Sequence, residues 1–485
     1  MRFASPNELR VISREYHGFY NAIVVGAIYE FRSSNFDVHS SCSFYGAVKH
    51  CIDKHPTLSA IVRDQHTDKA YFERVPTINL EEHIDIVTES DAGPSNAREK
   101  ANSETTIIES LLPAILDKPW PSDIPPWRAT IVPLKSGERG QDHPRCFIAF
   151  SFSHALGDGR NGFLWHRTFR DGIFDRVDEA AGTSLTTPRG EFPAPFDTPE
   201  SLPISWGFLL RPLIAVLLPN FLAEFLGFRP TTSHVDPSTW TGSRMFREPG
   251  PFNSCLRLIE IDAAATQKVL QLARGHGAKL TGTMIQSFAR GLSKAIPRSE
   301  ATRLISGMAV NMRRAVPNTS DEMGFFVGAC YETHERQDDW ASPWTEKTWA
   351  NARSLTEKLA EAAVTLHDQP VGLLRYVPSI TKWTASKIGQ ERDSSFDVSN
   401  LGAFEATLPG ISDDHSRCKI TDMVFTHSPA VTSAPLTVSA VSVKGSRLMI
   451  TIAWQPGALG IPRESEAGFV EELGTFVKKD LESLQ

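Results

Sequence analysis

A proline-dense segment divides this sequence into two halves. Between Thr186 and Pro251 prolines recur every few residues, and such density disfavours both helix interiors and central strands. The chain has 485 residues, whereas single hydrophobic cores stop growing at roughly 250–300 residues. We therefore expect a first domain of residues 1–190, a crossover of residues 191–250 and a second domain of residues 251–485.

Both halves alternate strand-like and helical segments. Asn21–Phe31 is β-branched and apolar, as is typical of strands, whereas Ala263–His276 has helical spacing and precedes Gly277. Further strands are expected at residues 58–62, 127–134, 146–154, 256–261, 303–312, 438–443 and 448–454. Further helices are expected at residues 44–54, 101–116, 281–295 and 344–367, and at the C-terminus. This alternation predicts an α/β fold with two mixed domains.

Charge and cysteine usage narrow the class of protein. Charged residues make up 22% and the net charge is −7, so no overall field attracts nucleic acid or anionic lipid. A local basic patch around an anionic cofactor stays open. The six cysteines form no C-x-x-C pair and no zinc-like spacing, which indicates reduced thiols in a cytoplasmic protein.

One apolar stretch, Ile204–Phe228, resembles a membrane segment but is too short to be one. Its uncharged part, Pro212–Ala223, has 12 residues, against about 20 needed to span a bilayer. We expect a buried or surface-docked helical hairpin. Peripheral contact with a membrane, such as that of the endoplasmic reticulum or a lipid droplet, is the alternative.

The stretch Cys146–Phe169 carries the strongest chemical signal. A predicted strand leads into His154, Asp158 and Gly159 follow, and a helix is expected to begin near Arg160. A histidine at a strand end is presented to a cleft on a fixed backbone, as a general base requires. Imidazole ordinarily titrates near pH 6.5, so a neutral fraction exists at cytoplasmic pH. His154 and Asp158 are therefore the candidate catalytic residues.

Two roles are open for Asp158, and two other kinds of site compete for this stretch. Asp158 either fixes the tautomer of His154 or turns away and holds the loop through an ion pair with an arginine. A metal site is disfavoured because no third ligand has a recognisable spacing. Gly157–Gly162 matches G-x-G-x-x-G, but residues 175–184 are not the buried strand that a dinucleotide site needs. The sequence contains no G-x-S-x-G elbow, which disfavours an α/β-hydrolase.

His154–Gly159 resembles the H-x-x-x-D-G signature of the chloramphenicol-acetyltransferase-like superfamily, which includes plant BAHD acyltransferases, peptide condensation domains and fungal alcohol acetyltransferases. Four other segments are similar to this superfamily, in its order: Lys54–Leu58, Pro125–Arg128, Asn311–Arg313 and Ser399–Gly402. Together the matches span residues 54 to 402.

Two differences and one similarity indicate the branch. The plant-type D-F-G-W-G is replaced by Ser399–Gly402, and Ser153 stands where condensation domains have a second histidine. Arg10–Tyr20 is similar to the beginning of fungal alcohol acetyltransferases. The resemblance implies a monomer with two chloramphenicol-acetyltransferase-like domains and an active-site tunnel between them.

The resemblance also implies a mechanism. Neutral His154 accepts the proton of an alcohol as its oxygen attacks an acyl thioester, with no acyl-enzyme and no bound cofactor or metal. Gly159, Ser399, Asn400 and Gly402 are the expected substrate-binding residues, with Ser399 or Asn400 stabilising the oxyanion. Asp158 is structural in the family, and Arg313 is its expected partner. The implied substrates are acyl-CoA, especially acetyl-CoA, and a small-molecule alcohol such as a secondary metabolite.

Two alternatives to this activity are open. The acyl group could instead come from an acyl-carrier protein, releasing a polyketide or peptide as an ester. A non-catalytic member of the superfamily would keep the tunnel only to bind a ligand or partner.

Overall fold

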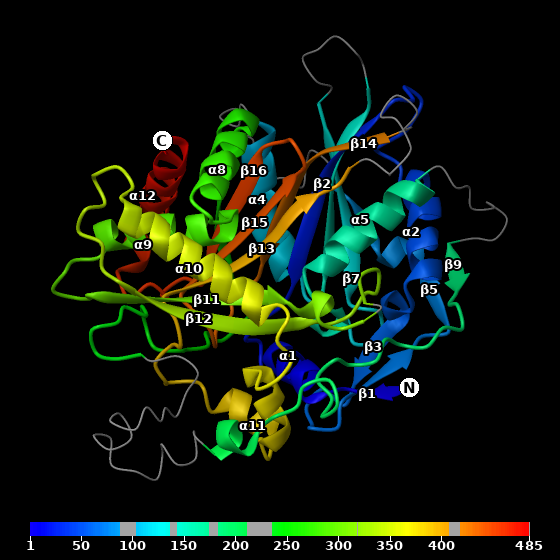
Figure 1. Cartoon of the computed structure of the whole chain (residues 1–485). Helices are drawn as coiled ribbons and strands as arrows, with labels where there is room; N and C mark the ends of the chain where they lie inside the picture. The colour runs from blue at the N-terminus through cyan, green and yellow to red at the C-terminus, as the bar shows by residue number, and fades with distance from the viewer. Residues whose placement is uncertain are drawn as a thin grey trace.

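Two mixed sheets, one in each half of the molecule, organise the computed structural model (Figure 1). The structure describes residues 1–87, 103–135, 143–173, 183–210, 235–317, 319–406 and 418–484. The first sheet has the strand order β14-β2-β8-β7-β6 and the second β10-β16-β15-β13-β11-β12. The expected α/β fold with two mixed-sheet halves is confirmed.

The first sheet contains the strand that leads to His154. Its strands are β2 (Ile23–Phe31), β6 (Ile84–Ile86), β7 (Trp127–Leu134), β8 (Arg145–Phe152) and β14 (Cys418–His427). Helix α5 (Arg160–Gly172) packs on β2 and β8, and α2 (Cys42–Lys54) packs on α5. The ring of Phe150 on β8 stacks on Trp165 of α5 at 4.5 Å. The two elements on either side of the His154 turn are thus held by a buried aromatic contact.

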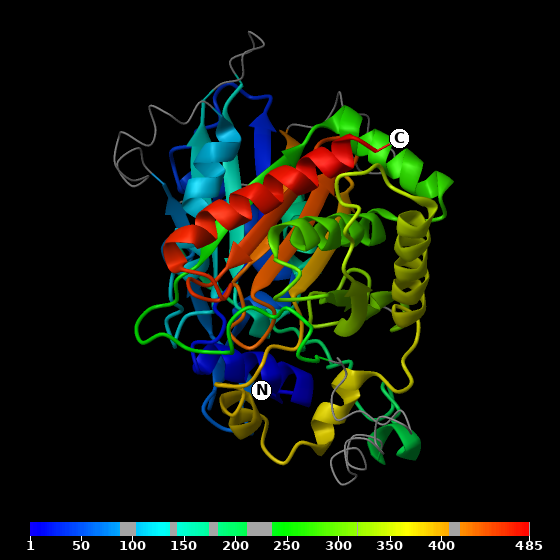
Figure 2. The ribbon, with the colours of Figure 1, turned by 90° about the vertical axis from the view of Figure 1, so that its left-hand side faces the viewer.

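The second sheet is covered by four helices. Its strands are β10 (Cys255–Ile261), β11 (Arg303–Asn311), β12 (Val327–Glu335), β13 (Phe396–Phe404), β15 (Leu436–Val443) and β16 (Leu448–Trp454). The helices are α8 (Ala263–Gly275), α9 (Leu280–Ala295), α10 (Glu346–Ala362) and α12 (Arg463–Glu482). Helix α12 crosses in front of this sheet and packs on α8, α9 and β10 (Figure 2).

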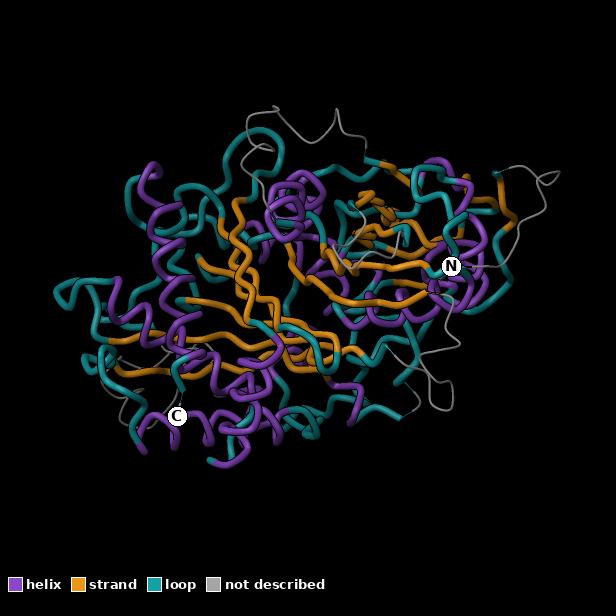
Figure 3. The backbone as a smooth tube through the Cα atoms, turned by 90° about the horizontal axis from the view of Figure 1, so that it is seen from above, coloured by secondary structure: helices purple, strands orange, loops and turns teal. Residues whose placement is uncertain are grey.

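Several elements join the two halves. Strand β14 comes late in the chain yet pairs antiparallel with β2 of the first sheet, and it also contacts β15 and β16 of the second (Figure 1). Seen from above, the strands run through the middle of the molecule with helices around them (Figure 3). Helix α4 (Glu104–Asp117) contacts β2, β8 and β10. Helix α1 (Pro6–Tyr16) packs on α11 (Ile380–Ala385). The remaining short strands are β1 (Arg2–Phe3), β3 (Ala60–Arg63), β4 (Tyr71–Arg74), β5 (Thr77–Asn79) and β9 (Ser184–Thr186).

Most element predictions are confirmed, and three need correction. The strand expected at residues 58–62 begins at Ala60, because Pro56 starts a 3-10 turn. The strand expected to end at His154 stops at Phe152, and His154 begins the 3-10 helix η3 (His154–Leu156). The helix expected at residues 344–367 covers Glu346–Ala362.

Other expectations are not tested. Most of the apolar stretch at residues 204–228 lies outside the described residues, as does most of the stretch at residues 175–184. Within the part of the chain that is described, no helix is long and apolar enough to cross a membrane. The domain boundaries at residues 190 and 250 stay a prediction.

Candidate active site

His154 lies at the end of β8, in a short turn that the sequence builds locally. The Ser153 side chain caps η3 by accepting a hydrogen bond from the Ala155 amide. The imidazole is held by rings on two sides, with ring-centre distances of 5.4 Å to Tyr20 and 4.9 Å to Phe325. The side chain is thereby oriented by packing on two distant parts of the chain.

The His154 ring is held in one tautomer. Its Nδ1 lies 2.8 Å from the Gly157 carbonyl oxygen, which only accepts, so Nδ1 carries the proton and Nε2 keeps its lone pair. Gly157 has a φ of +149°, and a Cβ there would overlap the Asn161 side chain. Burial, with a smaller contribution from the Arg10 charge, lowers the pKa of His154 to about 4, against the hydrogen bond to Gly157, which raises it. The ring is therefore neutral well below pH 6.5.

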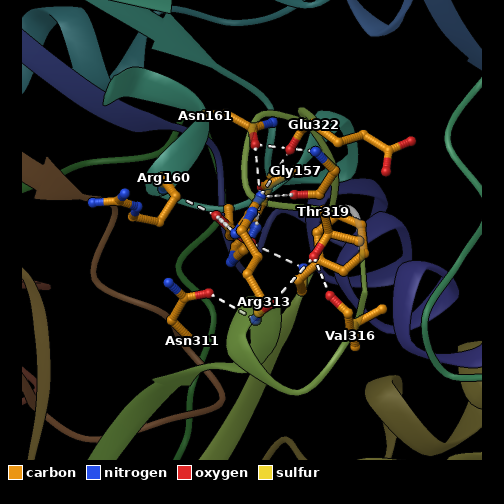
Figure 4. Close-up of polar contacts among 12 residues, drawn as sticks. Gly157, Arg160, Asn161, Asn311, Arg313, Val316, Thr319 and Glu322 are labelled. Carbon is orange, nitrogen blue, oxygen red and sulfur yellow. Dashed lines mark hydrogen bonds and ion pairs between the residues drawn. The ribbon is translucent and has the colours of Figure 1, made fainter. Parts of the chain in front are cut away.

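The Asp158 carboxylate binds Arg313, which belongs to the second half of the chain and whose surroundings are shown in Figure 4. Its Oδ1 and Oδ2 accept hydrogen bonds from Nη1 of Arg313 at 2.9 and 2.7 Å. The amides of Arg160 and Phe326 each donate to the same carboxylate at 2.9 Å. The Asp158 and Arg313 side chains are 2% and 5% exposed. Of the two roles open for Asp158, this geometry is that of a buried structural ion pair.

Asn161 completes this network. Its Oδ1 accepts hydrogen bonds from Nη2 of Arg313 at 3.3 Å and from the Gly324 amide at 3.1 Å. Its Nδ2 donates to the Leu156 carbonyl at 3.1 Å. Sequence reasoning missed Asn161, whose position in the first turn of α5 could have suggested a role beside Asp158. The network ties the His154 turn to the loop that carries Phe325.

The Ser399–Gly402 segment of β13 lies against the same turn. A Cβ at Gly159 would come within 2.8 Å of the Leu401 side chain, so the glycine permits this close approach. Nδ2 of Asn400 donates to Oγ1 of Thr281 at 3.0 Å, and its Oδ1 accepts from the Gly402 amide at 2.8 Å. Gly402 has a φ of +79° within a β-bulge. The two expected motifs therefore meet, one from each half.

Glu15, which the sequence did not single out, touches the residue before His154. Its Oε2 accepts a hydrogen bond of 2.5 Å from Oγ of Ser153. Burial raises the pKa of Glu15 to about 7 against this hydrogen bond. It also lines a cavity of about 290 Å³ bounded by Trp120 and Pro126. The carboxyl group is therefore poised to change charge near neutral pH.

This pKa predicts the effect of Glu15→Gln on stability. The unfolded chain releases the proton near pH 4.5, whereas the folded chain holds it to about pH 7, so stability present below pH 4.5 is lost as pH rises through 7. Glutamine removes this titration and still accepts from Ser153. The difference in unfolding free energy between Glu15→Gln and the wild type is the quantity of interest. We expect this difference to shift in favour of the variant by about 1–3 kcal/mol between pH 5 and pH 8. Urea unfolding at both pH values measures this, with Glu391→Gln on the surface as control, and an equal difference at both pH values would contradict it.

The chain's sequence and fold both match known acyltransferases. The family model described as alcohol acetyltransferase matches residues 12–471. The chain belongs to the alcohol acetyltransferase family. The chain is 24% identical to "Probable alcohol acetyltransferase crmB" of Aspergillus fumigatus, over 99% of this chain and 100% of that protein. It is 22% identical to "Probable alcohol acetyltransferase FCK4" of Fusarium pseudograminearum, over 74% and 73% of the two chains.

Solved structures agree on the fold of this alcohol acetyltransferase. The trichothecene 15-O-acetyltransferase TRI3 of Fusarium sporotrichioides superposes with a TM-score of 0.65 and 12% identity, covering 99% of this chain and 94% of that one. Family membership makes the protein an O-acyltransferase, and the fold is that of the chloramphenicol-acetyltransferase-like and condensation-domain enzymes. The expected family and enzyme class are confirmed.

Proposed function

We propose that this alcohol acetyltransferase transfers acetyl or another short acyl group from acyl-CoA to a hydroxyl group of a small molecule, with His154 as general base. The hydrogen bond from Nδ1 of His154 to the Gly157 carbonyl carries the proposal. It leaves the Nε2 lone pair available to accept a proton. Because burial lowers the pKa of His154, the ring is neutral and can accept a proton at the start of each turnover.

The proposed reaction is a direct transfer between two bound substrates. Nε2 of His154 takes the hydroxyl proton while the alcohol oxygen forms a bond to the thioester carbonyl carbon. The tetrahedral intermediate collapses, the carbon–sulfur bond breaks, and His154 returns the proton to the leaving sulfur. Holding both substrates in line lowers the barrier by about 7–11 kcal/mol. No acyl-enzyme forms.

We propose that β13 supplies the group that stabilises the oxyanion. One N–H of the Asn400 amide donates to Thr281, and an amide carries two such donors. The second N–H of Asn400 or the hydroxyl of Ser399 is the proposed donor. Gly159 and Gly402 are proposed to line the substrate passage. Gly159 lets Leu401 pack against the turn, and Gly402 has open space beside its backbone. Loss of one such donor typically costs about 10²–10³-fold in kcat.

Release of free thiol from a set of acyl-CoAs tests the proposal. The wild type and His154→Ala are each incubated with acyl-CoAs of increasing length, with and without pooled alcohols. We expect release that needs both an alcohol and His154. Release by His154→Ala at the wild-type rate would overturn the role of His154. Transfer from an acyl-carrier protein but from no acyl-CoA would replace the proposed donor, and transfer from neither would favour a ligand-binding role.

The pH dependence of kcat/KM is a further prediction. His154 acts when neutral, and burial lowers its pKa to about 4, so activity is lost only as pH falls toward that value. We expect kcat/KM for the alcohol to stay constant from about pH 8 to about pH 5. Initial rates measured after brief exposure, with circular dichroism as a control for unfolding, check this. A half-maximal loss near pH 6.5 would contradict it.

A monomeric state, a cytoplasmic location and peripheral membrane contact remain predictions from the sequence. Gel filtration and cell fractionation test them.

A further inference from the structure

Helix α1 carries two arginines that lie close to His154 and have no acidic partner. Arg10 and Arg14, here called the arginine pair, are four residues apart and so lie on one face of the helix. Nε and Nη2 of Arg10 donate only to Oδ1 of Asn7, at 3.2 and 3.0 Å. Among the described residues, no carboxylate lies within ion-pair distance of either guanidinium group, and the Arg14 side chain makes no hydrogen bond.

The arginine pair is half-buried and self-repelling. Burial lowers the pKa of both groups, for Arg10 to about 9, and the charge of Arg14 is the next largest cause of the shift at Arg10. Partly buried like charges without a counter-ion reduce stability, and a protein keeps them where another need outweighs that cost. The natural counter-ion for such a pair is an anion that arrives with a ligand.

Part of the second sheet lies within electrostatic reach of the arginine pair. Tyr331, Gly307 and Asp397 are register partners on the adjacent strands β12, β11 and β13. A Cβ at Gly307 would overlap Oδ1 of Asp397 and come within 3.4 Å of the Tyr331 ring, so the glycine lets the two side chains meet. Both groups act electrostatically on Arg14.

The acids near the arginine pair are already engaged. Asp397 accepts hydrogen bonds from Ser394 at 2.8 Å, from Ser433 and from the Ala434 amide. Asp197, which acts on Arg10 from a distance, accepts from the Asn7 amide at 2.9 Å. Arg10 and Arg14 together carry ten guanidinium hydrogens, and among the described residues only Asn7 accepts from them, twice.

We propose that the arginine pair binds an anionic group, a carboxylate or phosphate, carried by the acceptor alcohol. That this ligand is the acceptor alcohol rests on the proposed acyl transfer. The Arg10 guanidinium lies 6.0 Å from the Phe325 ring centre, and that ring lies 4.9 Å from the His154 ring centre. One aromatic ring thus separates Arg10 from the base, whereas the whole pantetheine arm separates the phosphates of CoA from its thioester. An anion held here while the hydroxyl meets His154 belongs to a compact acceptor.

Binding is tested first with a carboxylate that cannot react. Phenylacetate has no hydroxyl group, and phenylacetamide is its neutral control. We expect phenylacetate, but not phenylacetamide, to raise the melting temperature of the wild type, because a ligand of the folded state stabilises it. Arg14→Gln should lose this response and Arg244→Gln, which removes a surface charge, should keep it. An equal response in Arg14→Gln, or none in the wild type, would overturn the proposal.

Turnover then separates the acceptor from the donor as the source of the anion. Hydroxy acids and their methyl esters are compared as acceptors with acetyl-CoA as donor. We expect Arg14→Gln to reduce the ratio of kcat/KM for acid over ester by about 10- to 100-fold, the size of a lost charged hydrogen bond. An unchanged ratio with a raised KM for acetyl-CoA would assign the arginine pair to the donor and sink the proposal. Failure of acyl transfer itself would leave the phenylacetate result intact, so the two failures are distinguishable.

Discussion

We expect His154→Ala to lower kcat by about 10²–10⁴-fold, the usual contribution of a general base. Without the imidazole, the hydroxyl proton has to pass to water while the oxygen attacks. The fold should persist, because the ring makes one hydrogen bond, to Gly157, and otherwise packs on Tyr20 and Phe325. Single-turnover assays with a saturating acyl donor measure the effect on the chemical step.

His367→Ala is the matched control for this variant. His367 is exposed and paired with Asp368 on the surface, so its loss should leave kcat unchanged. Unfolding curves and circular dichroism establish that both variants are folded. A His154→Ala enzyme within tenfold of the wild-type kcat would remove His154 from the reaction.

The second large effect is expected at the buried ion pair. Asp158→Ala should reduce the free energy of unfolding by about 3–5 kcal/mol, because Arg313 is left charged and without a carboxylate in a site that excludes water. The same change leaves the Phe326 amide without its hydrogen-bond acceptor, because this amide donates to Asp158 at 2.9 Å. Urea unfolding at constant pH gives the value.

A double-mutant cycle isolates the pair from other effects of the change. Asp158→Ala combined with Arg313→Met should cost less than the sum of the single changes, since each single change leaves one charge unpaired. Glu391→Ala breaks the exposed pair with Arg244 and should cost less than about 1 kcal/mol. Equal costs for the buried and the exposed carboxylate would show that Asp158 does not stabilise the fold.

Local sequence patterns were enough to predict most helices and strands, and the family's motifs were enough to predict His154, Asp158 and Arg313. Apolar composition indicated β2, and helical spacing indicated α2, α8 and α9; each of them contributes buried residues to a hydrophobic core. Helix α1 was missed, although Ser5 and Glu8 form a capping box at its start. Strands β12 and β13 were missed as strands because their exposed and buried residues do not alternate clearly.

Local sequence patterns could not predict which distant segments pair with each other. Strand β14 joins β2 across more than 380 residues of chain, and nothing in its own residues names that partner. Glu15, Arg10 and Tyr20 belong to the site only because the N-terminal segment folds against the His154 turn. Each of these contacts joins segments that are far apart in the sequence, so the conformational preferences of neighbouring residues do not predict it.

Motif order and strand-to-turn patterning are properties of the chain, so they were enough to identify the family, the α/β class and the candidate base His154. The pKa of His154 depends on the folded environment, because burial lowers it to about 4 from the ordinary value near 6.5. The fold also shows that the Gly157 carbonyl, rather than Asp158, accepts the hydrogen bond of the imidazole. Protonation and hydrogen-bond choice depend on what surrounds a group, and those surroundings come from segments far apart in the sequence.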